Sequence, residues 1–186
     1  MTERGTEQIL ERLKRGNARF AERARADETR CAELARGQQP LAVVLACADS
    51  RVAPEIVFGA DLGELFVVRV AGNVANTSSI ASIEYAVANL GVRLVIVMAH
   101  ESCGAVAAVL EGGDSGSNLN HLLEHIAPAL GAPAESDADA VARRGARLNA
   151  ERLISESEIL RKACAEDGLR IATAFYRFTT GAVEFD

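Results

Sequence analysis

Four nearly continuous apolar runs set the fold class of this chain. They are Leu41–Cys47, Leu65–Ala71, Leu94–His100 and Leu169–Tyr176. Runs of Val, Ile and Leu without polar alternation are typical of parallel strands that are buried on both faces. Because helical patterns separate the runs, we predict an α/β fold with a mostly parallel sheet of order 2-1-3-4 and helices on both faces. A turn at Thr180–Gly181 predicts an antiparallel edge strand near the end of the chain.

Helices are expected between and beside these strands. The segment Ser78–Leu90 places apolar residues at helical spacing, and Gly91 is a natural stop. Further helices are predicted from Cys103 to Gly112, from Asn118 to Leu130 and from Arg147 to Glu166. Residues 111–117 and 131–139 have the composition of loops.

The chain is predicted to be one domain over residues 1–186, with a helical arm in residues 1–36 and an α/β core in residues 37–186. The arm is mixed in charge and carries an apolar stripe along roughly one side. The stripe consists of Ile9, Leu10, Leu13 and Phe20. A solvated helix and a helix that covers a partner subunit both fit this pattern.

Composition narrows the class of partner. The chain is 49% hydrophobic and 25% charged, which is enough apolar material for a sizeable core. Its net charge of −6 argues against a surface that grips nucleic acid. The first residues lack the apolar segment of a leader, and the run Leu94–Ala99 is too short to span a bilayer. We therefore expect a cytoplasmic protein that binds neither membranes nor nucleic acid.

Residues with metal-ligand chemistry follow two of the predicted strands. Cys47 ends the first strand, and the third strand ends in the sequence His100-Glu-Ser-Cys103. In an open parallel sheet, ligands bind at the carboxyl ends of the strands, where the strand order reverses. Two thiols and one imidazole suit zinc and leave a fourth position for water. Taken singly, each of these residues is more often a packed or hydrogen-bonded core side chain than a metal ligand, and it is their combination at two strand ends that packing does not easily explain.

A charged pair lies beside the predicted ligands. Asp49 and Arg51 are two positions apart, so the guanidinium can reach the carboxylate, lower its pKa and fix its orientation. An ionised Asp49 beside a metal can accept a hydrogen bond from a zinc-bound hydroxide. Without an adjacent metal, the pair would be an ordinary surface ion pair.

Other features of the sequence describe the surroundings of the site or exclude other kinds of site. Gly72 permits a tight turn after the second strand, which is expected to form a wall of the same crevice. No dinucleotide or Walker fingerprint follows a strand, so a nucleotide site is disfavoured. Cys31 and Cys164 have no metal partner at short spacing and are interpreted as small packed side chains.

The chain resembles the beta-class carbonic anhydrases over most of its length. Leu13–Phe20 resembles the family's LxxGNxRF, Cys47–Val52 its CxDSRV and His100–Gly104 its HxxCG. Phe66–Asn73, Ser82–Val87 and the closing segment Tyr176–Val183 also fit. The two metal motifs together are highly specific, and the other segments support them.

This resemblance implies zinc held by Cys47, His100 and Cys103, with Asp49 and Arg51 as a dyad beside the fourth position. It implies reversible hydration of carbon dioxide to bicarbonate and a proton by attack of zinc-bound hydroxide. It also implies a homodimer or higher assembly in which the N-terminal helices embrace a neighbouring subunit. In some members the aspartate itself binds zinc, so Asp49 is a further metal ligand only in such a closed form.

The sequence departs from the family pattern at several positions. The closed subgroup has a Trp where this chain has Val44, so we expect the open form. Ala99 replaces the usual Gly before the metal His, Val70 replaces a common Asn, and Ala172–Ala174 replaces a glycine-rich approach to the last strand. These changes leave two rivals open: a zinc hydrolase of carbonyl sulfide or carbon disulfide, and a non-catalytic zinc-binding homologue. A hydrolase with a nucleophilic cysteine is the least favoured, because it leaves the second thiol unexplained.

Two expectations concern proton transfer. Because two thiolates offset the charge of zinc, bound water should be acidified less than at an all-histidine site, which favours activity at alkaline pH. His121 and His125 are spaced to shuttle a proton, but the same spacing fits an ordinary helix surface.

Overall fold

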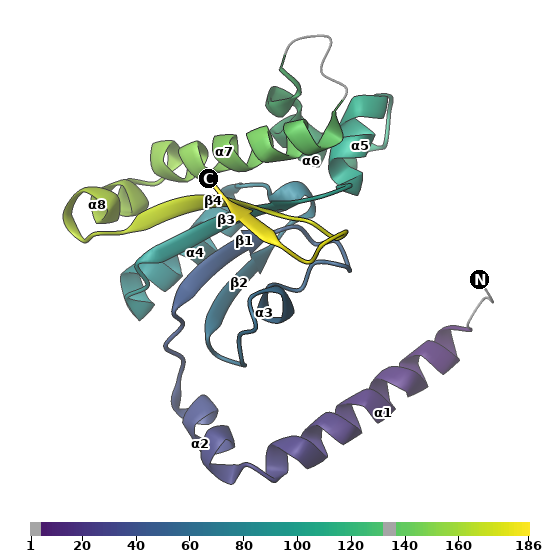
Figure 1. Ribbon diagram of the computed structural model, residues 1–186, viewed down its shortest axis with the longest axis vertical. Coiled ribbons are helices and arrows are strands. Elements are labelled where there is room, and N and C mark those ends of the chain that lie inside the picture. Colours follow the sequence, from purple (N-terminus) through teal and green to yellow (C-terminus); the bar gives the residue numbers. More distant parts are fainter. Residues whose placement is uncertain (1–4, 132–136) are drawn as a thin grey trace. The chain divides into compact units, whose positions relative to one another are not determined.

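The structure is a computed structural model that describes residues 5–131 and 137–186. The chain divides into two compact units, Met1–Gln38 and Gln39–Asp186. The second unit contains the sheet and is described first (Figure 1).

A five-stranded sheet of order β2-β1-β3-β4-β5 forms the centre of this unit. The strands are β1 (Ala42–Ala46), β2 (Leu65–Arg69), β3 (Leu94–His100), β4 (Arg170–Tyr176) and β5 (Val183–Phe185). β1 lies parallel between β2 and β3, β4 continues the parallel sheet, and β5 pairs antiparallel with β4. The predicted strand order and the antiparallel edge strand are confirmed. The second strand ends at Arg69, two residues before the predicted end, because residues 71–73 turn into a short 3-10 helix.

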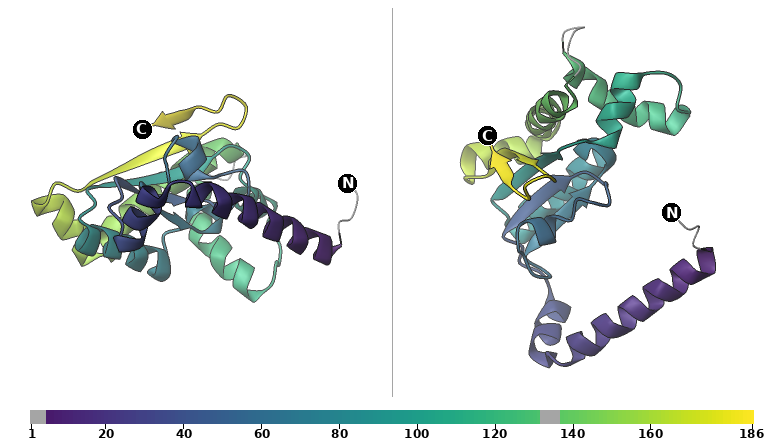
Figure 2. Two further views of the ribbon diagram at one scale, coloured as in Figure 1. Left: turned by 90° about the horizontal axis from the view of Figure 1, so that it is seen from below. Right: turned by 45° about the vertical axis from the view of Figure 1, so that its right-hand side comes forward.

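Two apolar layers bury the sheet. The larger layer packs against α4 (Thr77–Leu90), α5 (Gly104–Glu111), α6 (Ser117–Ile126), α7 (Ala138–Glu156) and α8 (Glu158–Glu166). Alternate residues of the strands enter it, for example Val43 and Leu45 of β1, while Val44 and Ala46 face the smaller layer. The smaller layer includes side chains of the short α3 (Pro54–Val57) and of the β4–β5 hairpin. Figure 2 shows the helices of the larger layer and the hairpin on opposite sides of the sheet.

Local signals set the ends of two helices. Gly91 ends α4 with a left-handed φ of 73°, as its position in the sequence predicted. The predicted helix 118–130 is α6 followed by a 3-10 turn, Ala127–Leu130, that contains a proline.

The prediction of a single helix from Arg147 to Glu166 is wrong. The chain forms two helices here, because Ser157 adopts an extended backbone and its hydroxyl accepts a hydrogen bond from the Leu160 N–H at 3.0 Å. α7 also begins at Ala138, inside the segment predicted as a loop, and Asp137 caps it. The remainder of that loop prediction, residues 132–136, lies outside the described residues.

The first unit consists of two helices, α1 (Thr6–Arg25) and α2 (Glu28–Arg36). Asp27 separates them and caps α2 through the Arg30 N–H. The predicted arm is therefore helical but broken, and residues 1–4 lie outside the described residues. Neither helix buries a single residue, and Leu13 is 65% exposed. Among the helices that the structure describes, none is long and apolar enough to cross a membrane.

Candidate metal centre

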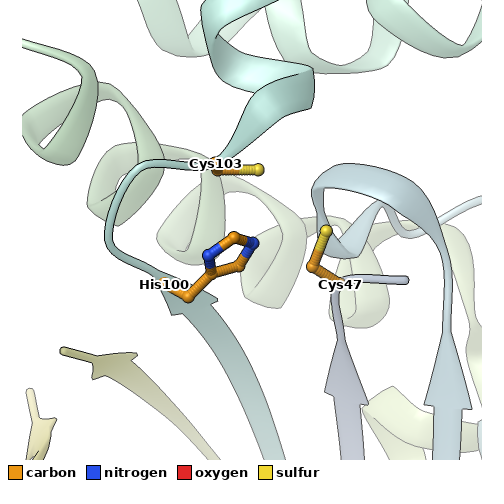
Figure 3. Close-up of side chains that lie close together, drawn as sticks. All are labelled: Cys47, His100 and Cys103. Carbon is orange, nitrogen blue, oxygen red and sulfur yellow. The ribbon is translucent and has the colours of Figure 1, made fainter. Parts of the chain in front are cut away.

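Three ligand-type side chains converge at the carboxyl edge of the sheet, between β1 and β3. Cys47 follows β1, His100 ends β3, and Cys103 lies immediately before α5. Their candidate ligand atoms lie within 4.8 Å of one another, and all three side chains are buried. Figure 3 shows the imidazole and the two sulfur atoms pointing toward one another. The structure thus brings together the three residues that the sequence predicted to share one centre.

The imidazole of His100 is oriented as a metal ligand. The side chain is fully buried, and its Nδ1 lies 2.8 Å from the carbonyl oxygen of Glu101, to which it can donate a proton. That contact leaves the lone pair on Nε2, which is buried without a hydrogen-bond partner. An unsatisfied buried nitrogen costs free energy, whereas a metal ion would use its lone pair. The orientation of His100 therefore fits a bound cation.

Backbone N–H groups surround the sulfur of Cys47. The N–H of Gly72 donates to Sγ at 3.2 Å, and the N–H of Asp49 donates to it at 3.4 Å. Gly72 has a φ of 68°, and a Cβ there would lie 2.5 Å from Cδ1 of Ile126, so glycine allows this close approach. The predicted place of Gly72 at the wall of the crevice agrees with this contact.

The surroundings of the two thiols shift their pKa values in opposite directions. A hydrogen bond from Cys103, supported by His100 and the two backbone N–H groups, lowers the pKa of Cys47 to about 4 despite its burial. The same contact with Cys47, together with burial, raises the pKa of Cys103. Burial by itself lowers the pKa of His100, but the nearby Cys47 sulfur and the Glu101 carbonyl raise it overall. The donors around the Cys47 sulfur favour a thiolate, and a thiolate at this centre would stabilise a cation.

The composition of the donor set narrows the choice of metal. Two thiolates and one imidazole are borderline-soft ligands that suit zinc. Three protein ligands leave a fourth position for water or substrate, as at catalytic zinc sites. The other two cysteines, Cys31 and Cys164, are free and are not part of the group.

Asp49 and Arg51 form the ion pair that their spacing predicted. Arg51 Nε donates to Oδ1 of Asp49 at 3.0 Å, and Nη2 donates to Oδ2 at 2.7 Å. This two-pronged contact holds the pKa of Asp49 well below its ordinary value. The Asp49 carboxylate is not part of the three-residue group, so its role as a ligand in a closed form stays a prediction.

The ring of Phe178 adds to the environment of the pair. It lies 4.4 Å from the guanidinium carbon of Arg51 and 5.2 Å, centroid to centroid, from the His100 imidazole. The aromatic face stabilises the cation and shields the histidine from water. Glu101 holds the loop that carries this ring, because its carboxylate accepts a hydrogen bond from the Thr179 N–H at 3.0 Å.

No role was assigned from the sequence to two residues that support the centre, Arg69 and Asp139. Arg69 donates from Nε to the carbonyl of Cys47 at 3.0 Å and from Nη2 to the carbonyl of Asp49 at 2.7 Å. Asp139 accepts a hydrogen bond from the Ser102 N–H at 3.2 Å. The only signal for Arg69 was its place at the end of a strand, and the segment that contains Asp139 looked like a loop.

His121 and His125 lie on α6. The ring of His121 is 76% exposed and forms a contact with Glu124, while Nδ1 of His125 lies 3.2 Å from Nη1 of Arg152. Burial is the main cause of the lowered pKa of His125, and the positive charge of Arg152 lowers it further. These contacts fit a helix surface, and a shuttle role for either histidine stays a prediction.

An open α/β sheet with a buried Cys-His-Cys group where its strand order reverses defines a metal-binding α/β protein. The chain matches the family model described as carbonic anhydrase over residues 42–183. It therefore belongs to the carbonic anhydrase family, in the beta class that its structural neighbours represent. The predicted resemblance is confirmed.

Individual relatives give the same result. Carbonic anhydrase 2 of Mycobacterium tuberculosis is 47% identical over 97 residues, which are 50% of this chain and 47% of the relative. The match thus spans about half the length of that relative. A tetrameric beta-carbonic anhydrase from the ascomycete Sordaria macrospora superimposes with a TM-score of 0.82 at 28% identity, covering 96% of each chain. The Coccomyxa enzyme superimposes with a TM-score of 0.82 at 26% identity, covering 95% of this chain and 85% of its own.

Proposed function

We propose that this protein catalyses the reversible hydration of carbon dioxide to bicarbonate and a proton. The observation that carries the proposal is the buried Cys47-His100-Cys103 group with the Asp49–Arg51 pair beside it, in a chain of the carbonic anhydrase family. The pair alone would be of little consequence on a surface. Next to a three-ligand centre it would supply a fixed, ionised hydrogen-bond acceptor.

Zinc is the cofactor that these residues would hold, through the two sulfur atoms and Nε2 of the histidine. Nε2 is the buried atom that lacks a partner, so binding would satisfy it. When bound, zinc supplies a Lewis acid that lowers the pKa of a coordinated water and makes a nucleophile available near neutral pH.

The chain's own residues would orient the reactants. Asp49 stays ionised at neutral pH because Arg51 holds its pKa down, so a carboxylate oxygen can accept a hydrogen bond from the attacking water. Arg51 fixes the plane of that carboxylate by two hydrogen bonds. Arg69 holds the backbone of the same turn. These contacts pre-position the acceptor before substrate arrives.

Self-association as a homodimer or a higher assembly belongs to the same proposal. The helices α1 and α2 bury no residue of their own, and their exposed apolar residues need a surface to cover them. These residues include Ile9, Leu10, Leu13 and Phe20. A second copy of the chain is the occupant that the family resemblance suggests, and the Sordaria relative is described as tetrameric. The cytoplasm is the proposed location, since a reducing compartment keeps the ligand thiols available.

The test is an assay of carbon dioxide hydration by zinc-loaded protein, with Asp49→Ala as the variant. We expect the rate to fall by about 100-fold or more, the usual effect of losing a group that handles a proton. Zinc content should remain at the parent level, because the three ligands are untouched.

The matched control is Asp167→Ala, which removes an exposed carboxylate just after α8, near the amino end of β4. It should retain the parent rate. A zinc-loaded parent that hydrates no carbon dioxide would refute the proposal. Carbonyl sulfide and carbon disulfide, assayed in parallel, would then separate a sulfur-analogue hydrolase from a non-catalytic homologue.

A further inference from the structure

We propose that Asp139, in the first turn of α7, is a positioning residue for the Asp49–Arg51 pair and acts through the backbone of Ser102. The inference rests on the proposed function, because it concerns the geometry of the pair that the reaction would use. It assigns a role to a residue that is far from the metal motifs in the sequence.

The first observation is the conformation of Ser102. This residue lies between the ligands His100 and Cys103 and has a φ of 53°. Apart from glycines, only it and Asn73 have a positive φ among the described residues. A side chain with a Cβ disfavours the left-handed region, so surrounding contacts must hold it there. The turn that joins two metal ligands is therefore strained and depends on external support.

Asp139 supplies that support on the N–H side. Its Oδ1 accepts the hydrogen bond from the Ser102 N–H at 3.2 Å. The aspartate is itself anchored, since its own N–H donates at 3.0 Å to the side chain of Asp137, which caps α7. Its second oxygen, Oδ2, lies 3.9 Å from Nη1 of Arg177. These contacts fix the carboxylate where it meets the strained turn.

The carbonyl side of Ser102 leads to the pair. Nη2 of Arg51 donates at 3.2 Å to the Ser102 carbonyl oxygen and at 2.7 Å to Oδ2 of Asp49. One guanidinium nitrogen thus joins the turn to the carboxylate. The Arg51 side chain is 53% exposed, so the contact with Ser102 adds to the few that hold the guanidinium, namely its bonds to Asp49 and the ring of Phe178. If Ser102 relaxes from its left-handed conformation, its carbonyl turns and Arg51 loses an acceptor.

Asp139→Ala and Asp139→Asn separate this role from a general contribution to the helix. Alanine removes the acceptor, whereas asparagine retains an oxygen for the Ser102 N–H and loses the charge that faces Arg177. In zinc-loaded protein we expect Asp139→Ala to lower kcat for carbon dioxide hydration by about 10-fold, as lost support of a metal centre commonly does, with KM and zinc content unchanged. Asp139→Asn should restore most of kcat.

A second readout does not depend on activity. In a ¹H–¹⁵N NMR spectrum, solvent exchange of the Ser102 amide should be about 10-fold faster in Asp139→Ala than in the parent, because this N–H loses its acceptor. Exchange of the Arg51 Nε–H, which donates to Asp49, should be faster as well, because the guanidinium is held less firmly once Nη2 loses the Ser102 carbonyl. Glu151→Ala, which removes an exposed carboxylate from the same helix, should change neither rate.

The outcomes distinguish a failure of the positioning role from a failure of the proposed function. Parent-like kcat and parent-like exchange in Asp139→Ala would overturn the positioning role, and so would an Asp139→Asn variant as impaired as alanine. If the zinc-loaded parent proves inactive, the proposed function fails, yet the exchange rates of Ser102 and Arg51 still test the link. A variant with lower thermal stability but unchanged exchange at both groups would also contradict it.

Discussion

The two turns that carry the candidate metal ligands are held in opposite ways. A cation holds the turn after β1, since Arg69 donates to the carbonyls of Cys47 and Asp49. Carboxylates hold the turn after β3, since Asp139 accepts from Ser102 and Glu101 accepts from Thr179. The first turn is fixed by one side chain of the neighbouring strand, whereas the second depends on contacts from α7 and from the β4–β5 hairpin.

The difference extends to the thiols. Backbone N–H groups point at the sulfur of Cys47, and its pKa is lowered, whereas the pKa of Cys103 is raised. The two turns thus surround their thiols differently, with backbone N–H donors at Cys47 and burial at Cys103. Each prediction below tests this asymmetry, and they run from the largest expected effect to the smallest.

The largest effect is expected from Cys103→Ala. Removal of one of three protein ligands should weaken zinc binding by more than about 100-fold, beyond the loss that outer hydrogen-bond partners cause. Zinc affinity can be measured by competition with a chromophoric chelator. Cys31→Ala, which changes a free cysteine of α2, should retain the parent affinity. Equal affinities in the two variants would mean that the ligand group is misidentified.

Arg69→Met should have an intermediate effect. Methionine retains the aliphatic stem but removes the donors to two backbone carbonyls, so the Cys47 turn becomes free to move. We expect zinc affinity to fall by about 10-fold in the same competition experiment. Arg170→Met is the matched control, because Arg170 begins β4 and lies at the edge of the sheet opposite the metal centre. An unchanged affinity in Arg69→Met would show that the first turn does not need its cation.

The smallest effect is expected for the stability of the fold at acid pH. It involves the β4–β5 hairpin, which supports the second turn. Arg177 and Arg143 both donate to Glu184 of β5, which lowers the pKa of Glu184 below its ordinary value of 4.5. A carboxylate with a lowered pKa in the folded chain stabilises it above the ordinary pKa, and this contribution disappears as pH falls through the folded value. Glu184→Gln should therefore flatten the fall of thermal stability between neutral pH and about pH 3.

Thermal unfolding followed by circular dichroism across that range checks this expectation. Glu151→Gln serves as the control, because it neutralises an exposed carboxylate of α7 and should leave the slope at its parent value. If Glu184→Gln loses stability toward acid as steeply as the parent does, the arginine contacts to β5 contribute nothing to the pH dependence.

Much of the fold could be predicted because its signals are local. Buried parallel strands are continuous apolar runs, and the predicted strand order is one that brings the two metal motifs to adjacent carboxyl ends. Gly91 marked the end of α4 because its φ of 73° suits glycine. The helix break at Ser157 was missed, since its extended backbone is stabilised by tertiary packing: the Ser157 hydroxyl donates to Glu84 of α4 at 2.6 Å.

The candidate ligands and the Asp49–Arg51 pair could also be predicted, because each motif is a short segment in which residue type and spacing carry the chemistry. The supporting residues could not. Arg69 and Asp139 belong to segments 20 and 37 residues away from the backbone groups that they bind. Their sequence neighbourhoods contain no partner, so no local pattern distinguishes them from surface charges.

The sequence by itself determined the class of fold, the identities of the three candidate ligands and the charged pair, because apolar continuity and motif spacing are properties of contiguous residues. Only the tertiary structure decided which nitrogen of His100 is left without a partner, which sulfur receives backbone N–H donors, and which distant side chains hold the two turns. Those features depend on burial and on hydrogen bonds between separate elements, and they exist only once β1, β3 and α7 pack together.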